Sequence, residues 1–253
     1  MFRVIVEFCG KQLGKVYLGQ MPEPGSTIWT TQLTALIQDI LKQVDPQGLR
    51  LVYVSDDGYH PSDYYHDVLK TMQDPKRPWC TLAWIRIVDY YHACLYIQQL
   101  ADAVFGASLK GRAWAKQMRK HLKTQSDGIT RVLQSAGALR RQHGLSGMAK
   151  DYAQAYAYLK KRTHWMRYRH YSSQRLPIGS GITEAACKIV FTQRLKRSGM
   201  SWTISGGQVI LDLRVLWLSG VWKNVHQRYL ASQPMPMTQE ERAKVVQPWQ
   251  QAA

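Results

Sequence analysis

Residues 49–68 read LRLVYVSDDGYHPSDYYHDV and place two adjacent carboxylates directly after an apolar run. The run LRLVYV predicts a strand that ends at Asp56 and Asp57. Acid at the end of a sheet strand is costly unless a positive group binds there. Ligands of open α/β sheets bind beyond the carboxyl ends of the strands, so we expect a functional site at this edge.

The residues upstream of this strand indicate a crossover connection. Residues 2–8 and 16–21 predict the two strands of a hairpin, with turn glycines between them. Residues 27–44 place apolar side chains at helical spacing and therefore predict a helix. A strand–helix–strand crossover of this length implies parallel pairing, right-handed by the usual rule. The predicted fold class is α/β, a mixed sheet with helices on its faces.

The rest of the chain divides into further regions. Residues 81–88 predict another strand that runs into the sequence DYYH, and the pattern from there to about Arg175 is helical. Pro177 and the glycines after it break this pattern. In the helix expected from about Gly207, five apolar side chains should be buried: Val209, Ile210, Leu213, Leu216 and Trp217. We expect a sheet region in 1–92, a basic helical insertion in 93–175, C-terminal helices in 176–229 and a flexible tail in 230–253.

Charge is distributed unevenly along the chain. The net charge is +17, yet residues 1–100 hold 9 Lys and Arg against 10 Asp and Glu, whereas residues 101–253 hold 25 against 7. Between Lys110 and Arg175 there are 16 basic and 2 acidic residues. Clustered Lys and Arg neutralise phosphates and release counterions, so we expect a polyanion, and DNA in particular, as the partner.

One expected helix in this region carries a cationic stripe. Basic residues at intervals of three or four place positive charge on one broad face, and an ordinary solvated helix would carry acidic partners at that spacing. Aromatic residues are interleaved in AYAYLKKRTHWMRYRHY, which suits either stacking on bases or plain helix packing. The candidate DNA-binding residues of the stripe are Arg112, Lys116, Arg119, Lys120 and Lys123.

Other classes of protein are excluded by composition. No apolar stretch approaches the roughly 20 residues of a membrane-spanning helix, and no secretory leader follows Met1, so the cytoplasm is the expected compartment and no membrane is expected as a partner. The cysteines are Cys9, Cys80, Cys94 and Cys187, and their spacing indicates neither a zinc ribbon nor a disulfide framework.

A divalent metal would explain the carboxylates at the strand end. Carboxylate oxygens from a strand end and from a distant helix can hold two Mg²⁺ ions that stabilise the attacking and leaving oxygens of phosphodiester chemistry. Glu184 lies in the first turn of an expected helix and is the candidate partner of Asp57 or Asp56. The basic helical region lies between these acids in the sequence.

The stretch LPIGSGITEAACKIVFTQRLKRSGMSW, residues 176–202, closely resembles the signature of bacterial insertion-sequence transposases of the ISKra group. The resemblance runs from Phe2 to about Trp222 and implies a DDE transposase with an RNase H-like core, Mg²⁺ or Mn²⁺ as cofactor, and a homodimer that binds transposon ends and target DNA. It implies that Glu184 is the third catalytic acid and Asp57 the second, with Asp56 the competing choice, and that Asp57 and Glu184 are metal ligands. It also places the basic residues Arg194, Lys196 and Arg197 near DNA.

The chain departs from this family at its first catalytic aspartate. That aspartate belongs to a strand upstream of the expected hairpin, and here no aspartate precedes Asp39. Glu7 is the only early acid in a strand, in the position of the second strand. We therefore expect a truncated transposase, inactive by itself. The alternatives are a non-catalytic DNA-binding or dimerising fragment and a different RNase H-like nuclease. Asp89 and His92 of DYYH receive no role.

Overall fold

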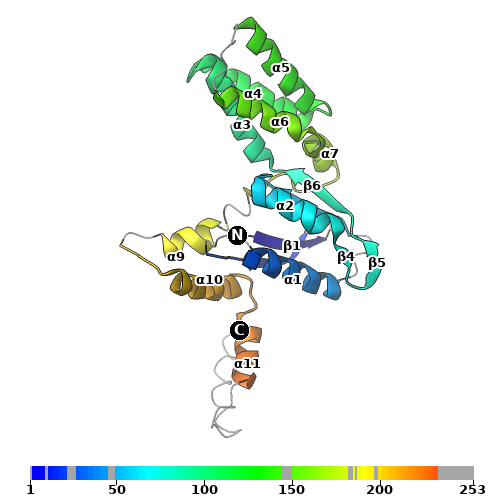
Figure 1. Cartoon of the computed structure of the whole chain (residues 1–253), viewed down its shortest axis with the longest axis vertical. Coiled ribbons are helices and arrows are strands. Elements are labelled where there is room, and N and C mark those ends of the chain that lie inside the picture. Colours follow the sequence, from blue (N-terminus) through cyan, green and yellow to red (C-terminus); the bar gives the residue numbers. More distant parts are fainter. Residues whose placement is uncertain are drawn as a thin grey trace.

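The protein is mixed α/β in its computed structural model, which describes residues 2–8, 11–21, 27–44, 49–143, 150–181, 185, 187–196 and 199–232 (Figure 1). Of residues 2, 3, 6–8 and 11–13, the backbone alone is described. Strands and helices of the N-terminal part lie in the middle of the view, and a group of helices lies at one end.

Strands of the N-terminal part form three separate pairs. The hairpin consists of β1 (Phe2–Phe8) and β2 (Lys11–Leu18), which pair antiparallel. The sequence predicts this hairpin, but β2 begins at Lys11, inside the predicted turn, and ends at Leu18 instead of residue 21. The second pair is parallel and joins β3 (Leu51–Ser55) to β6 (Trp84–Val88). Helix α1 (Thr27–Gln43) connects the hairpin to β3 and buries Leu33, Ile37 and Leu41, four residues apart along one face. Between β3 and β6 lie α2 (Tyr59–Asp67), the 3₁₀-helix η2 (Leu69–Thr71) and the short strands β4 (Gln73–Asp74) and β5 (Arg77–Thr81), which form the third and shortest pair.

A helical region follows β6 directly. It holds α3 (Tyr90–Phe105), α4 (Leu109–Thr124), α5 (Gly128–Gln142), α6 (Lys150–Lys161), the 3₁₀-helix η3 (Thr163–Trp165) and α7 (Tyr168–Ser173). These helices form the group at the upper end of Figure 1. They share one apolar core with β6, because Ile87 and Val88 are buried among their side chains. The region is therefore packed onto the parallel pair.

The C-terminal elements cover the hairpin. They include the π-helix η4 (Lys188–Thr192), α9 (Gln193–Leu195), α10 (Ile204–Leu218) and α11 (Trp222–Ser232). The backbone N–H of Tyr17 donates to Ser219 Oγ at 3.0 Å, and that of Met21 donates to Gln208 Oε1 at 2.8 Å. These bonds, with the buried residues Val190 and Leu211, hold α10 against β2.

The sheet differs from the prediction. The described strands form three two-stranded sheets, and the parallel partner of β3 is β6 and not a strand of the hairpin. The crossover therefore joins the hairpin to a strand that does not pair with it. Among the described residues, no strand pairs with the other edge of β3.

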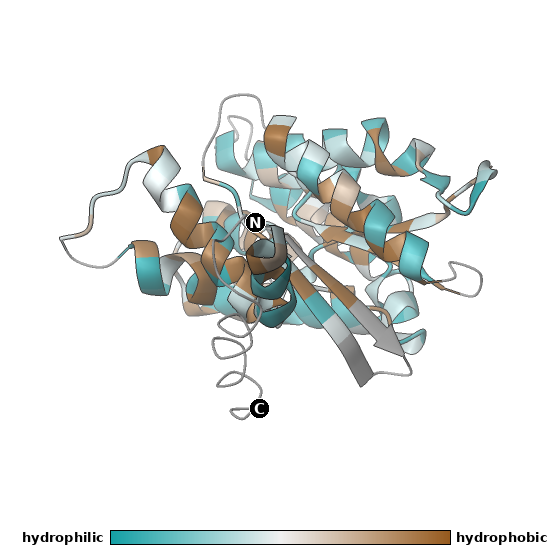
Figure 2. Ribbon diagram, turned by 90° about the horizontal axis from the view of Figure 1, so that it is seen from below, coloured by the Kyte–Doolittle hydropathy of each residue, from teal (hydrophilic) through white to brown (hydrophobic). Residues whose placement is uncertain are grey.

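Burial along α10 is also different from the prediction. Val209, Leu213 and Trp217 are 58%, 42% and 68% exposed, whereas Leu211 is buried. Apolar residues surround this helix on nearly every side, so periodicity could not identify the packed face (Figure 2). Helix α11 continues to Ser232, beyond Tyr229, where we predicted that the tail begins.

No single helix in the described ranges is long and apolar enough to cross a membrane. Helices α10 and α11 reach that length and composition only together, and they are bent by 120° at their junction.

Candidate functional site

The carboxyl ends of β3 and β6 bring three aspartates to one edge. Asp56 and Asp57 follow β3, and Asp89 follows β6. Because the strands run parallel with Ser55 opposite Val88, both carboxyl ends face the same way. The backbone N–H of Asp89 continues the ladder and donates to the carbonyl of Ser55 at 2.7 Å. The predicted position of a functional site therefore coincides with a real meeting point of acidic residues.

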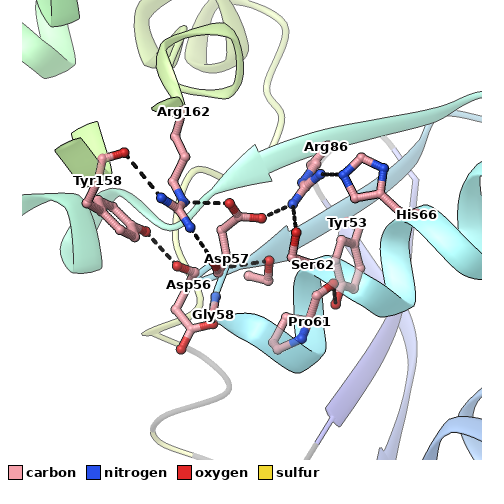
Figure 3. Close-up of polar contacts among 11 residues, drawn as sticks. Tyr53, Asp56, Asp57, Gly58, Pro61, Ser62, His66, Arg86, Tyr158 and Arg162 are labelled. Atoms are coloured by element: carbon pink, nitrogen blue, oxygen red, sulfur yellow. Dashed lines mark hydrogen bonds and ion pairs between the residues drawn. The ribbon is translucent and has the colours of Figure 1, made fainter. Parts of the chain in front are cut away.

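Asp57 is buried and lies between two arginines (Figure 3). Its side chain is 3% exposed. Arg86 Nη2 donates to Oδ1, and Arg162 Nε donates to Oδ2 at 2.5 Å. Arg162 Nη2 also donates to the backbone carbonyl of Asp57 at 2.8 Å. Both carboxylate oxygens of Asp57 are thus engaged by guanidinium groups.

Arg86 is the buried partner of this cluster. It lies on β6, is 4% exposed, and stacks between the rings of Tyr65 and Trp165, at 4.6 Å and 4.0 Å from their centroids. Its Nη atoms also contact His66 Nε2 and Ser62 Oγ, each at 2.9 Å. Burial lowers the pKa of Arg86, because removal of water disfavours the charged form. A charged guanidinium in this buried position therefore needs a compensating anion.

Arg162 reaches the same carboxylate from the helical region. It follows the last turn of α6 directly, and its guanidinium lies 4.0 Å from the ring centroid of Tyr158, on the same helix. Tyr158 donates its hydroxyl to the carbonyl of Asp56 at 2.5 Å. Burial raises the pKa of Tyr158 well above its usual value, so the hydroxyl keeps its proton. The end of α6 is therefore attached to both residues that follow β3.

Asp56 has a different environment. It is exposed, and the contact recorded for its carboxylate is local, with the backbone N–H of Gly58 donating to Oδ1 at 3.1 Å. Of the two adjacent aspartates, Asp56 thus faces solvent and Asp57 faces the arginines.

Asp89 joins the end of β6 to the PIGSG loop. Its carboxylate caps α3 by accepting from the backbone N–H groups of Tyr91 and His92, at 2.6 and 3.1 Å. The other oxygen accepts from the hydroxyl and the backbone N–H of Ser180. Asp89 is 1% exposed, so these four donors satisfy a buried charge. This contact spans 91 residues and brings the loop before Glu184 to the edge where Asp56 and Asp57 lie.

Not every predicted site residue can be placed. Glu184 and Arg197 lie outside the described residues, and of Glu7 the strand backbone alone is described. Convergence of Glu184 with Asp57 therefore stays a prediction. Arg194 and Lys196 are both exposed, after η4.

The predicted stripe on α4 holds with one change. Arg112, Lys116, Lys120 and Lys123 are exposed on the helix. Arg119 is half-buried and donates to Gln98 Oε1 on α3 at 2.6 Å, so it links two helices.

Helix packing accounts for much of the aromatic run in α6 and α7. Tyr152, Tyr158, Tyr168 and Tyr171 are buried. Tyr168 donates its hydroxyl to the carbonyl of Val88 at 2.9 Å, and Tyr152 donates to the carbonyl of Ala136 at 2.8 Å. Buried hydroxyls with such partners are not available to nucleic-acid bases.

The carboxylates in their described positions do not form a metal site. Among the residues that the structure describes, no group of three or more His, Cys, Asp or Glu side chains is arranged to hold a metal ion. Asp57 does not fit a ligand role in this arrangement, because guanidinium groups occupy both of its oxygens. Of the adjacent pair, Asp56 alone presents an exposed carboxylate.

Reasoning from sequence missed the partners of these aspartates. Arg86 carried a usable signal, because it interrupts the apolar strand WIRIV, and a buried arginine needs an anion. Ser180 and Arg162 carried none, since their partners lie 91 and 105 residues away.

Comparisons of this chain with models of protein families, with curated proteins and with solved structures found no match.

Proposed function

We propose that this chain is a DNA-binding protein of the DDE transposase lineage. Its core would be RNase H-like, and the reaction of the lineage would be metal-dependent cleavage and transfer of DNA strands. The partner would be double-stranded DNA, bound by a homodimer. Asp56 or Asp57 and Glu184 are the proposed acids, and Mg²⁺ or Mn²⁺ is the proposed cofactor.

The observation that carries this proposal is the contact between Asp89 and Ser180. It draws Ser180 of the PIGSG loop, four residues before Glu184 in the sequence, to the carboxyl end of the parallel pair. Asp56 and Asp57 follow the neighbouring strand at that same end. The motif and the strand-end acids, more than 120 residues apart in sequence, are therefore neighbours in the fold. This proximity is what a site shared by strand and helix acids requires.

The charge of the helical region supports DNA as the partner. Four cations of the stripe are exposed along α4, and the end of α6 and the start of α7 add exposed basic residues, which suits contact with a phosphate backbone. The region is attached to the acidic edge through Arg162 and Tyr158. DNA held on this region would therefore lie on a body fixed to the candidate site. The additional basic residues are Lys160, Lys161, Arg167 and Arg169.

A non-catalytic DNA-binding protein is the second candidate. The pairing of Asp57 with Arg86 and Arg162 favours it, because a carboxylate held by two cations is not available to a metal ion. Under this reading the chain binds DNA, alone or beside an intact transposase, and cuts nothing.

Two measurements test the proposal. Binding of the full chain to duplex DNA of unrelated sequences, followed by fluorescence anisotropy over a series of KCl concentrations, should show affinity that falls steeply with salt and depends little on sequence. A log–log slope near zero would contradict DNA binding.

Nicking separates the two candidates. Supercoiled plasmid is incubated with the chain in Mg²⁺ or in EDTA, and the Glu184→Gln variant is the matched control. Nicking that needs Mg²⁺ and disappears in the variant supports a catalytic protein. Salt-dependent binding without nicking supports the non-catalytic one, whereas cleavage of RNA–DNA hybrids in preference to plasmid indicates a different RNase H-like nuclease.

A further inference from the structure

The resemblance allows either Asp56 or Asp57 as the strand-end acid, and the geometry separates their roles. We infer that Asp57 is a positioning residue: its ion pairs with Arg86 and Arg162 fix the basic helical region over the carboxyl end of the parallel pair. Asp56 is then the carboxylate of the pair that faces solvent. The orientation of the basic helical region toward DNA rests on the proposed function, but the ion pairs themselves can be tested without DNA.

Asp57 balances the buried charge of Arg86. The side chain of Arg86 is 1% exposed, and Asp57 is the carboxylate in contact with it. Its other recorded polar neighbours, Ser62 and His66, do not supply a negative charge. If Asp57 turned away to bind a divalent cation, the buried guanidinium would lose its anion. Breaking one member of a buried pair costs much more than an exposed pair contributes.

The two arginines also disfavour a divalent cation at Asp57. A divalent ion on Asp57 would lie beside two guanidinium groups that already contact both carboxylate oxygens. Like charges at that distance repel strongly in a site shielded from water. The cluster therefore selects against a metal ion at Asp57.

The end of α6 is attached to Asp56 and Asp57. Asp57 lies in the left-handed region with φ of 55°, a conformation that few residues other than glycine adopt. Arg162 Nη2 donates to the carbonyl of Asp57, and Tyr158 donates to the carbonyl of Asp56. Arg162 Nε also donates to the carboxylate of Asp57. Three donors at the end of α6 therefore bind the two consecutive residues after β3.

Helix α6 connects Asp57 to the stripe on α4 through a shared core. Helix α6 buries Tyr152, Ala155 and Leu159 in the core that α3, α4 and α5 share. A close-packed core transmits orientation from one helix to the next. By holding the end of α6, Asp57 therefore sets the direction in which the stripe on α4 faces relative to Asp56.

A double-mutant cycle tests the ion pairs. Asp57→Asn, Arg162→Met and the double variant are unfolded with urea, and Asp56→Asn is the matched control. We expect Asp57→Asn to lower the folding equilibrium constant by about 100-fold or more, whereas Asp56→Asn changes it by no more than about threefold. The double variant should be less affected than the product of the two single effects. If Asp57→Asn and Asp56→Asn are equally mild, the inference is wrong.

Orientation is measured separately, in Arg162→Met, because Arg162 is 20% exposed and its loss is the gentler change. Spin labels on noncanonical amino acids at Lys70 in η2 and Gln117 in α4 report the distance between sheet and helical region by pulsed EPR. We expect a single narrow distribution in the wild type, a broader one in Arg162→Met, and partial recovery in Arg162→Lys. A purely local stabilising role would leave the distribution unchanged and would overturn the inference.

Binding of Mn²⁺ alone, followed by EPR, tests the alternative that Asp57 is a metal ligand. Loss of Mn²⁺ binding in a stably folded Asp57→Asn, with Asp56→Asn unaffected, would overturn the inference. If the chain fails to bind DNA but the cycle shows coupling, the proposed function fails while the ion-pair anchor stands.

Discussion

Neutralising the exposed stripe on α4 should flatten the salt dependence of DNA binding by a calculable amount. The variant replaces Arg112, Lys116, Lys120 and Lys123 with Gln, and all four side chains are exposed on one face of the helix. Each phosphate contact contributes about 0.9 to the slope of log K against log salt, so four contacts correspond to about 3.6. Between 50 and 200 mM salt, a slope of about 3.6 amounts to an affinity change of about 150-fold.

The assay is fluorescence anisotropy with one duplex at several KCl concentrations, on wild type and variant in parallel. Circular dichroism should show that both are equally folded, because exposed Lys to Gln changes cost little stability. Lys42→Gln with Lys70→Gln removes two charges from the sheet region and serves as the control, with a slope close to that of the wild type.

A slope in the four-residue variant that equals the wild-type slope would refute the reasoning, since DNA would then bind elsewhere. Arg119 refines the test. Its guanidinium donates to Gln98, so Arg119→Gln should lower the free energy of unfolding. The same substitution should leave the slope of log K against log salt close to the wild-type value. The reverse pattern would show that Arg119 leaves α3 and contacts phosphate.

Gly128→Ala should destabilise the protein by about 1–3 kcal/mol in urea unfolding, because its Cβ would lie 2.3 Å from the carbonyl oxygen of His121, whereas Gly137→Ala meets nothing closer than 3.9 Å and should be neutral or stabilising. Ser180→Ala removes a hydroxyl donor from a buried carboxylate and should cost about 1.5–3 kcal/mol, against less than about 0.5 for the exposed Ser173→Ala. The free energy of unfolding should fall as pH rises above 10, because burial raises the pKa of Tyr90, Tyr158 and Tyr168. At such pH the unfolded chain loses protons that the folded chain keeps. A free energy of unfolding that stays constant above pH 10 would contradict the burial of these hydroxyls.

Local patterns predicted local elements well. The spacing of Leu33, Ile37 and Leu41 indicated α1 and its buried face, and the β-branched runs indicated the hairpin and the strands at Leu51 and Trp84. Each of these features depends on neighbours within a few residues, which is the range that periodicity covers. The acidic edge was also predicted, because both strands end in aspartate.

Long-range pairing was beyond such patterns. Nothing near Asp57 in the sequence distinguishes it from Asp56. The side chain of Asp57 is buried because Arg86 and Arg162 pair with it in the folded chain. Strand pairing failed for the same reason, since β3 could have met either a hairpin strand or β6. On α10, an apolar residue at almost every turn left several faces equally suitable for burial.

The two ends of the helical region meet at one point. The backbone N–H of Tyr90 donates to the carbonyl of Ile178 at 2.8 Å, and the next residues outward, Asp89 and Ser180, are also hydrogen-bonded to each other. Nearly ninety residues therefore begin after β6 and end before the C-terminal helices within hydrogen-bond distance of each other. Helices α3 to α7 bury apolar side chains against one another in a shared core, so this region supplies much of its own stabilisation. In terms of chain topology it is a unit inserted between β6 and the C-terminal helices, and the chain enters and leaves it beside the contact of Asp89 with Ser180.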